Sequence, residues 1–194
     1  MATNIEIEAK VLITEEEYER LVKSLSKNVV AEYDQINYYI ESKDFDLQKK
    51  GISLRVRLLD GKYTMTLKAP LSEGLLEKNC VLTKEDFEVL LKKNIFPDND
   101  ISEFLKMLGF KVSELSIITS LKTHRIETKY GQEAYEFSVD KNEYNGIVDF
   151  ELEMANDSLL KAKTQLQKIC YQVGINYEDN PKSKQTRALE SIKK

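Results

Sequence analysis

Carboxylate residues alternate with apolar residues in two separate segments of the sequence. Glu6 and Glu8 do so near the amino terminus, and Glu151 and Glu153 do so later in the chain. Because successive side chains of a β-strand point to opposite faces, each pair would share one face of a sheet. Carboxylate pairs at this spacing are hard oxygen ligands of the kind that Mg²⁺ or Mn²⁺ prefers. The sequence therefore predicts a divalent metal site made of these four glutamates.

Cationic residues show the same alternation in other segments. Arg55 and Arg57 alternate with leucine and valine, and Lys68 and Arg125 lie in comparable segments. A guanidinium group matches phosphate oxygens with two parallel hydrogen bonds, and a lysine adds a point charge. Phosphoryl transfer needs mainly positioning, neutralised charge and an oriented water. We therefore expect these four cations to bind a phosphate chain.

Lys10 lies on the strand face of Glu6 and Glu8. From that position it could contact a terminal phosphate or help to position the attacking water, so Lys10 and Glu8 are the predicted catalytic residues. The ordinary explanation of such alternation is a sheet with one face in solvent. Repeated charges of one sign on a strand face argue against that explanation, because they repel each other unless something compensates them.

The elements that must position these residues are short strands joined by hairpins, with helices between them. Strands are predicted near 5–11, 35–40, 52–59, 62–69, 75–82, 116–130, 133–141 and 147–155, and helices after Thr14 and at 44–50, 84–94, 101–108, 158–173 and 183–192. Asp60-Gly61 and Asn145-Gly146 are typical hairpin turns. This pattern predicts an α+β fold, mainly antiparallel β, in which an eight-stranded closed barrel has helices packed outside. We expect a single domain over residues 1–194.

The composition restricts the class of protein. The chain has 194 residues, of which 41% are hydrophobic and 32% charged, and its net charge is -4. An acidic balance argues against a general binder of nucleic acid or anionic membranes. Cys80 and Cys170 match no disulfide framework or thiolate metal site, and no apolar run is long enough to span a bilayer. We therefore expect a cytoplasmic protein that acts on a small molecule.

The segment Glu6-x-Glu8-x-Lys10 resembles the ExExK signature of the CYTH domain family, the triphosphate tunnel metalloenzymes, which include class IV adenylate cyclases and thiamine triphosphatases. Further matches follow in order along the chain: Arg55-x-Arg57, Lys68, Glu77, Arg125, Asp140, Glu151-x-Glu153 and the weaker candidate Lys184. The resemblance implies an eight-stranded β-tunnel, adds Glu77 and Asp140 to the metal ligands, and adds Lys184 to the phosphate contacts. Asn79 departs from the pattern, because many members carry an acidic residue there.

The leading hypothesis is a divalent-metal-dependent triphosphatase that acts on tripolyphosphate, thiamine triphosphate or a nucleoside triphosphate. A class IV-type adenylate cyclase, which forms cyclic AMP and pyrophosphate, is the first alternative. A polyphosphate or nucleotide binding module without turnover and a purely structural barrel are the others. The sequence leaves the physiological substrate, the number of metal ions and the oligomeric state open. A homodimer is the commonest default for soluble oligomers.

Overall fold

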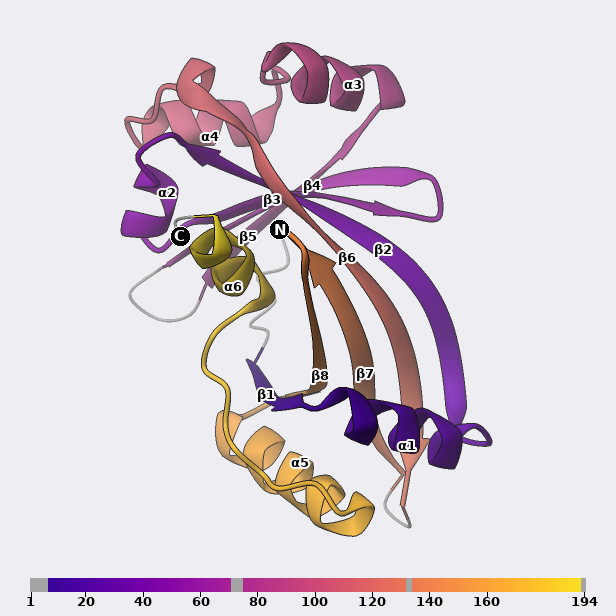
Figure 1. Ribbon diagram of the computed structural model, residues 1–194. Helices are drawn as coiled ribbons and strands as arrows, with labels where there is room; N and C mark the ends of the chain where they lie inside the picture. The colour runs from indigo at the N-terminus through magenta and orange to yellow at the C-terminus, as the bar shows by residue number, and fades with distance from the viewer. Residues whose placement is uncertain (1–6, 71–74, 132–133, 193–194) are drawn as a thin grey trace. The chain divides into compact units, whose positions relative to one another are not determined.

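The computed structural model describes residues 7–70, 75–131 and 134–192. Its strands pair in the order β1-β8-β7-β6-β2-β3-β4-β5. The strands are β1 (Ile7–Ile13), β2 (Val29–Ser42), β3 (Ser53–Leu59), β4 (Lys62–Pro70), β5 (Leu75–Leu82), β6 (Leu115–Tyr130), β7 (Tyr135–Tyr144) and β8 (Ile147–Asn156) (Figure 1). The helices are α1 (Glu15–Leu25), α2 (Asp46–Lys49), α3 (Lys84–Lys93), α4 (Asp100–Met107), α5 (Leu159–Val173) and α6 (Lys184–Ser191), with a 3₁₀ turn at Val112–Glu114.

The predicted fold class is confirmed. Helices accompany an eight-stranded sheet whose pairs β1–β8, β8–β7, β7–β6, β2–β3, β3–β4 and β4–β5 are antiparallel. Over the described residues the hydrogen-bonded order begins at β1 and ends at β5, so hydrogen bonds do not close the sheet into a ring. None of the helices in these residues is both long and apolar enough to cross a membrane.

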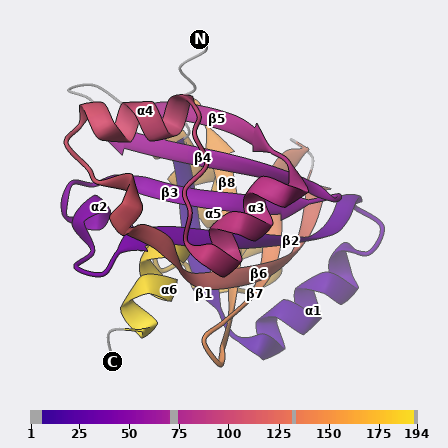
Figure 2. The same ribbon diagram turned by 90° about the horizontal axis from the view of Figure 1, so that it is seen from above.

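The chain divides into two compact units, and β2 and β6 contribute residues to both. The first unit comprises 35–70, 75–121 and 188–192, and the second comprises 7–34, 122–131 and 134–187. In the first unit, the apolar faces of β3 and β4 pack with α3 and α4 around residues such as Val56, Leu67, Leu90 and Leu105. Helix α3 contacts β4 and β5, and α4 contacts β5; Figure 2 shows both helices over this part of the sheet. The opposite face of β3 therefore carries Arg55 and Arg57 away from this core.

The second unit has the same division between an apolar face and a polar face. Ala9 and Val11 of β1 and Leu152 of β8 are buried with Leu166 of α5 in one core. Helix α5 packs against β1 and β8, and α1 also contacts β8. Because the strand side chains alternate, Lys10, Glu151 and Glu153 point away from this core.

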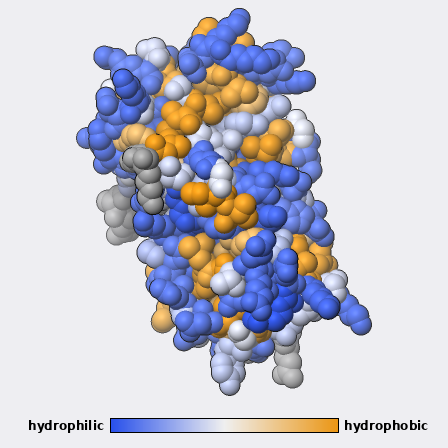
Figure 3. Space-filling model, viewed as in Figure 1, coloured by the Kyte–Doolittle hydropathy of each residue, from blue (hydrophilic) through white to orange (hydrophobic). Residues whose placement is uncertain are grey.

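Short-range signals in the sequence determine where several elements begin and turn. Thr14 and Glu17 form a reciprocal capping box at the start of α1, and Thr83 and Asp86 form another at α3. The Asp60-Gly61 turn joins β3 to β4 with positive φ at both residues, and Asn145-Gly146 joins β7 to β8 in the same way. The two predicted hairpin turns are confirmed. The surface seen in Figure 3 is largely hydrophilic, with smaller hydrophobic groups between the polar residues.

A pair of substitutions on α5 tests whether its buried face stabilises the second unit. Leu166 is fully buried, whereas Leu160 on the same helix is 77% exposed. We expect Leu166→Ala to lower the free energy of unfolding by about 2–5 kcal/mol, because it leaves a cavity in the core. Leu160→Ala should change it by less than about 0.5 kcal/mol. Urea unfolding followed by circular dichroism measures the free energy of unfolding of both variants. Equal losses of this free energy would contradict the packing of Leu166 in the core.

Candidate metal and phosphate site

Three carboxylates from adjacent strands meet on the polar face of the second unit. In the strand register, Asp140 of β7 lies opposite Glu151 of β8, and Glu153 lies two residues further along β8. One carboxylate oxygen from each residue lies within 4.8 Å of the other two. Asp140 and Glu151 are fully buried, and Glu153 is 8% exposed. Ionised carboxylates this close and this buried require cations beside them.

Lys184, the first residue of α6, supplies one of these cations. Its Nζ contacts all three carboxylates: Glu151, Glu153 and Asp140, the last at 2.9 Å from Oδ2. Burial disfavours the charged form of Lys184, but the three carboxylates outweigh burial and raise its pKa above the ordinary lysine value. The structure thus places this predicted phosphate ligand among the carboxylates.

Arg125 of β6 supplies the second cation. Its Nε and Nη2 donate to the two oxygens of Asp140 at 2.9 and 2.7 Å, and Nη2 also lies 3.4 Å from Glu153. Burial alone would raise the pKa of the Glu153 carboxyl, but Lys184, Lys10 and Arg125 hold it well below its usual range. Glu153 is therefore held in its charged form.

The segment before α6 is fixed against β1, which explains how Lys184 reaches the carboxylates. The backbone of Asp179 forms an isolated antiparallel β-bridge with Val11, and the backbone N–H of Asn180 donates to the carbonyl of Lys10 at 2.9 Å. The Nζ of Lys163 on α5 forms an ion pair with Oδ2 of Asp179 at 2.7 Å. We call residues 177–183 the connecting segment. Its attachments lead the chain from α5 to the polar face of the sheet.

Arg187 is a site residue that the sequence analysis missed. Its Nη1 donates to Glu151 at 2.6 Å, and its Nε and Nη2 donate to the two oxygens of Asp149 at 2.9 and 3.2 Å. Two signals in the sequence could have identified it. Arg187 follows Lys184 by three positions on a helix, so both lie on one helix face. Asp149 precedes Glu151 by two positions on a strand and shares its face.

Glu8 and Lys10 lie together on β1, as predicted. Lys10 Nζ donates to the Glu8 carboxylate at 2.7 Å, and the register pairs Lys10 with Glu153. Burial and the nearby charge of Glu153 raise the pKa of Glu8, although Lys10 opposes this. Burial would lower the pKa of Lys10, but Glu153 and Glu8 raise it. Glu6, a predicted metal ligand, lies outside the described residues.

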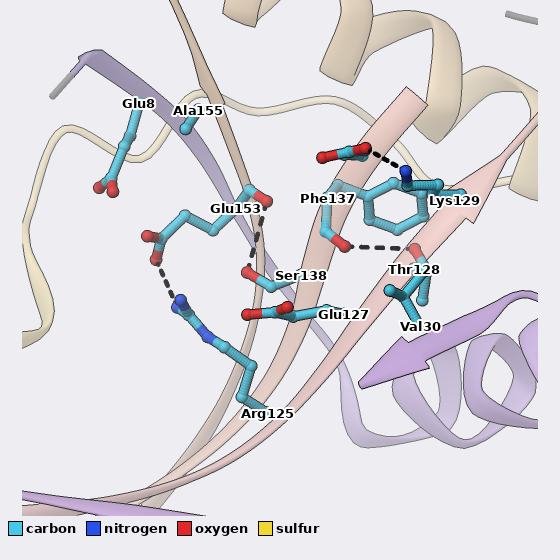
Figure 4. A pocket seen from close by; sticks show the side chains of 11 residues that line it. Glu8, Val30, Arg125, Glu127, Thr128, Lys129, Phe137, Ser138, Glu153 and Ala155 are labelled. Carbon is cyan, nitrogen blue, oxygen red and sulfur yellow. Dashed lines mark hydrogen bonds and ion pairs between the residues drawn. The ribbon is translucent and has the colours of Figure 1, made fainter. Parts of the chain in front are cut away.

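A pocket of about 280 Å³ opens beside these residues in the second unit. Glu8, Arg125 and Glu153 lie toward one end of it, and Lys129 and Thr128 lie toward the other (Figure 4). Glu127 also lines the pocket, and the hydroxyl of Tyr33 donates to its carboxylate at 2.6 Å. Glu127 was not among the predicted site residues, although its position two residues after Arg125 on β6 places both on one face.

The first unit carries a separate polar face with the predicted arginines. Arg57 Nε donates to Asn37 at 3.0 Å, and the register places Arg55 beside Thr66. The Nε of Arg55 is buried, and it has no hydrogen-bond partner among the described residues. A buried N–H donor without an acceptor is costly, so an anion bound at this position would satisfy it.

Lys68 and Glu77 lie opposite each other on β4 and β5 of the first unit, 3.3 Å apart. Asn79 donates to Glu77 at 2.8 Å and accepts from Thr66 at 2.7 Å. Burial would raise the pKa of Glu77, but Asn79, Lys68 and Arg55 lower it. At position 79, where the sequence departs from the acidic pattern, the side-chain amide of Asn79 links Thr66 to Glu77.

The donor set of the second unit fits a divalent metal of the Mg²⁺ or Mn²⁺ type. Asp140, Glu151 and Glu153 offer only carboxylate oxygens, and their separation allows one ion to contact all three. Histidine and cysteine are not part of this group, so a softer metal is not favoured. Cations beside these oxygens could in turn bind phosphate. A metal ion held by the three carboxylates, together with the cations beside them, would neutralise the charge of a bound polyanion.

Comparisons with known proteins identify one family. The model of the family described as "CYTH domain" matches residues 4–182. YjbK of Bacillus subtilis (strain 168), which is provisionally named a triphosphatase, is 28% identical over 194 residues, covering 100% of this chain and 99% of that protein.

Two solved structures extend the comparison. A structure from Bacillus halodurans, provisionally named an adenylate cyclase, is 33% identical with a TM-score of 0.82, covering 96% of this chain and 98% of that one. HpAC1 from Hippeastrum, whose structure is described as revealing a dominant triphosphatase activity, is 21% identical with a TM-score of 0.76, covering 96% and 95% of the two chains. At this lower identity the likeness to HpAC1 shows the fold.

Removing Arg125 tests the dependence of the buried carboxylates on their cations. We expect Arg125→Met to lower the free energy of unfolding by about 3–5 kcal/mol, because Asp140 would lose its bidentate partner inside the protein. Lys122→Met is the matched control on the same strand. Lys122 lies 3.5 Å from Asp34, and both side chains are about half exposed, so its loss should be below about 1 kcal/mol. Chemical denaturation compares the two, and similar losses would contradict a structural role for the Arg125 pair.

Proposed function

This chain belongs to the CYTH domain family, and from that premise we propose that it is a triphosphatase that requires Mg²⁺ or Mn²⁺. Its substrate would be inorganic tripolyphosphate or an organic triphosphate such as thiamine triphosphate or a nucleoside triphosphate. The observation that carries the proposal is the contact of three buried carboxylates with cations on the polar face of the second unit. YjbK, which covers the whole chain, supports it by its name.

The metal would be held by Asp140, Glu151, Glu153 and Glu8 of the second unit, with Glu6 as a further candidate from the sequence. Glu77, the remaining candidate from the sequence, belongs to the first unit. When bound, such an ion neutralises phosphate oxygens and lowers the barrier for charge that develops on the leaving group. Glu8 and Glu153 line the same pocket, which gives a substrate access to this group.

The residues of the chain would perform the remaining work of hydrolysis. Arg125 and Lys10 would bind phosphate oxygens and orient the terminal phosphorus. Glu8, whose side chain lines the pocket, would accept a proton from the attacking water. The water oxygen then bonds to the terminal phosphorus as the bond to the bridging oxygen breaks, which leaves orthophosphate and a diphosphate.

We also propose that the polar face of the first unit binds phosphate through Arg55, Arg57 and Lys68. The buried Nε of Arg55 supports this role, because an oxygen acceptor would complete its hydrogen bonding. Lys184 is proposed as a further phosphate ligand in the loaded enzyme.

An adenylate cyclase is the second candidate, and the name of the Bacillus halodurans relative favours it. In that reaction the ribose 3′-hydroxyl of ATP attacks the α-phosphorus, and pyrophosphate leaves. The two candidates differ in their products from ATP, which are cyclic AMP and pyrophosphate for the cyclase and ADP and phosphate for the hydrolase. Chromatography of the products separates them.

Hydrolysis of tripolyphosphate tests the leading proposal. We expect phosphate release with Mg²⁺ or Mn²⁺ and none in EDTA. Glu8→Gln should reduce the rate by at least about tenfold, because it removes a charged oxygen from the proposed site. Glu19→Gln, an exposed position on α1, is the control and should keep the wild-type rate. Equal release by the wild type and Glu8→Gln would sink the proposed role of Glu8, and no release from any triphosphate would sink the hydrolase.

A second substitution tests phosphate binding by the first unit. We expect Arg55→Gln to raise the KM for tripolyphosphate by about tenfold, the value of one charge-assisted hydrogen bond. Lys62→Gln, which removes one charge at an exposed position of β4, should leave KM unchanged. Steady-state kinetics at saturating metal measures both. An unchanged KM for Arg55→Gln would favour a purely structural role for this arginine.

A further inference from the structure

The ammonium group of Lys184 lies where a metal ion would need to contact its ligands. It contacts the same three carboxylates whose oxygens lie close enough to share one ion. A lysine has three N–H donors, so these contacts can use all of them. An ammonium and a divalent cation cannot both contact the same oxygens at short range, because they repel each other and occupy the same space.

The charge balance around the carboxylates is nearly complete without a metal. The ion pairs at this site join five carboxylates, Glu8, Asp140, Asp149, Glu151 and Glu153, to four cations, Lys10, Arg125, Lys184 and Arg187. A divalent ion added to this group would give it a positive balance. The ion binds favourably only if a cation leaves or an anion arrives with it.

Lys184 is the cation whose departure the structure can accommodate. If it leaves, Asp140 keeps its bidentate contact with Arg125, and Glu151 keeps its contact with Arg187. The arginines hold the carboxylates in position by paired hydrogen bonds. The lysine has a flexible side chain with a single charged group, so it can move without disturbing the connecting segment.

We propose that Lys184 is an internal counter-ion that a divalent metal must displace, and that the displaced ammonium binds the incoming phosphate chain. This inference rests on the proposed function. It assigns opposite effects to one side chain: the positive charge of Lys184 opposes a metal at the carboxylates, and it attracts a phosphate chain whether or not a metal is bound. A purely structural lysine would not produce this pair of effects.

Two calorimetric titrations of Lys184→Gln test the proposal, one with Mn²⁺ alone and one with tripolyphosphate in EDTA. We expect Mn²⁺ to bind at least about fivefold more tightly than to the wild type, within the usual range for coupling between sites. Tripolyphosphate in EDTA should bind at least about fivefold more weakly. Lys182→Gln removes the same charge from an exposed position in the connecting segment and should leave both affinities unchanged. Lys184→Arg, which keeps the charge, should not tighten Mn²⁺ binding.

Folding and metal binding of Lys184→Gln are checked first. Circular dichroism and the rise in Tm on adding Mn²⁺ show whether Lys184→Gln is folded and binds metal, and a larger rise than in the wild type supports the proposal. Unchanged or weaker Mn²⁺ binding, or loss of the fold with Mn²⁺ present, overturns it. If one of these contrary results is found while the wild type hydrolyses tripolyphosphate with metal, this inference fails and the proposed function stands. If neither protein binds Mn²⁺ or tripolyphosphate, the proposed function fails as well.

Discussion

The burial of carboxylates on neighbouring strands is the constraint on which this structure depends. Asp140 and Glu151 are fully buried, and a buried carboxylate without a partner costs several kcal/mol. Two elements distant in sequence from one another supply the cations: β6 contributes Arg125, and α6 contributes Lys184 and Arg187. The course of the connecting segment over β1 follows from this requirement as much as from apolar packing.

Because side chains alternate along each strand, the apolar residues that form the core and the charged residues of the proposed sites lie on opposite faces. In the second unit, Val11 and Leu152 are buried with α5, while the residues beside them, Lys10 and Glu151, lie on the polar face. The first unit repeats this arrangement with Val56 in the core and its neighbours Arg55 and Arg57 opposite. A one-residue shift in register would exchange the two faces, so the register that builds each core also assembles each set of charges.

The sequence predicted the features that depend on neighbours in the chain. The helix after Thr14, both two-residue hairpin turns, and the shared face of Glu151 and Glu153 are confirmed, because each follows from backbone geometry over a few residues. The partners of Lys184 and the role of Arg187 could not be predicted, since they depend on where the connecting segment crosses the sheet. The open hydrogen-bond order and the early start of β2 at Val29 also depend on tertiary pairing. A single domain and the individual roles of the site residues stay predictions.

The order in which the carboxylates and their cations occur along the chain affects folding during synthesis. A ribosome makes β7 and β8 before it makes Lys184 and Arg187, and chain growth takes place at about 5–20 residues per second. Until the later residues emerge, Glu151 lacks both of its cations, and water is the more favourable environment for its charge. This part of the sheet therefore reaches its final packing only after α6 has been made.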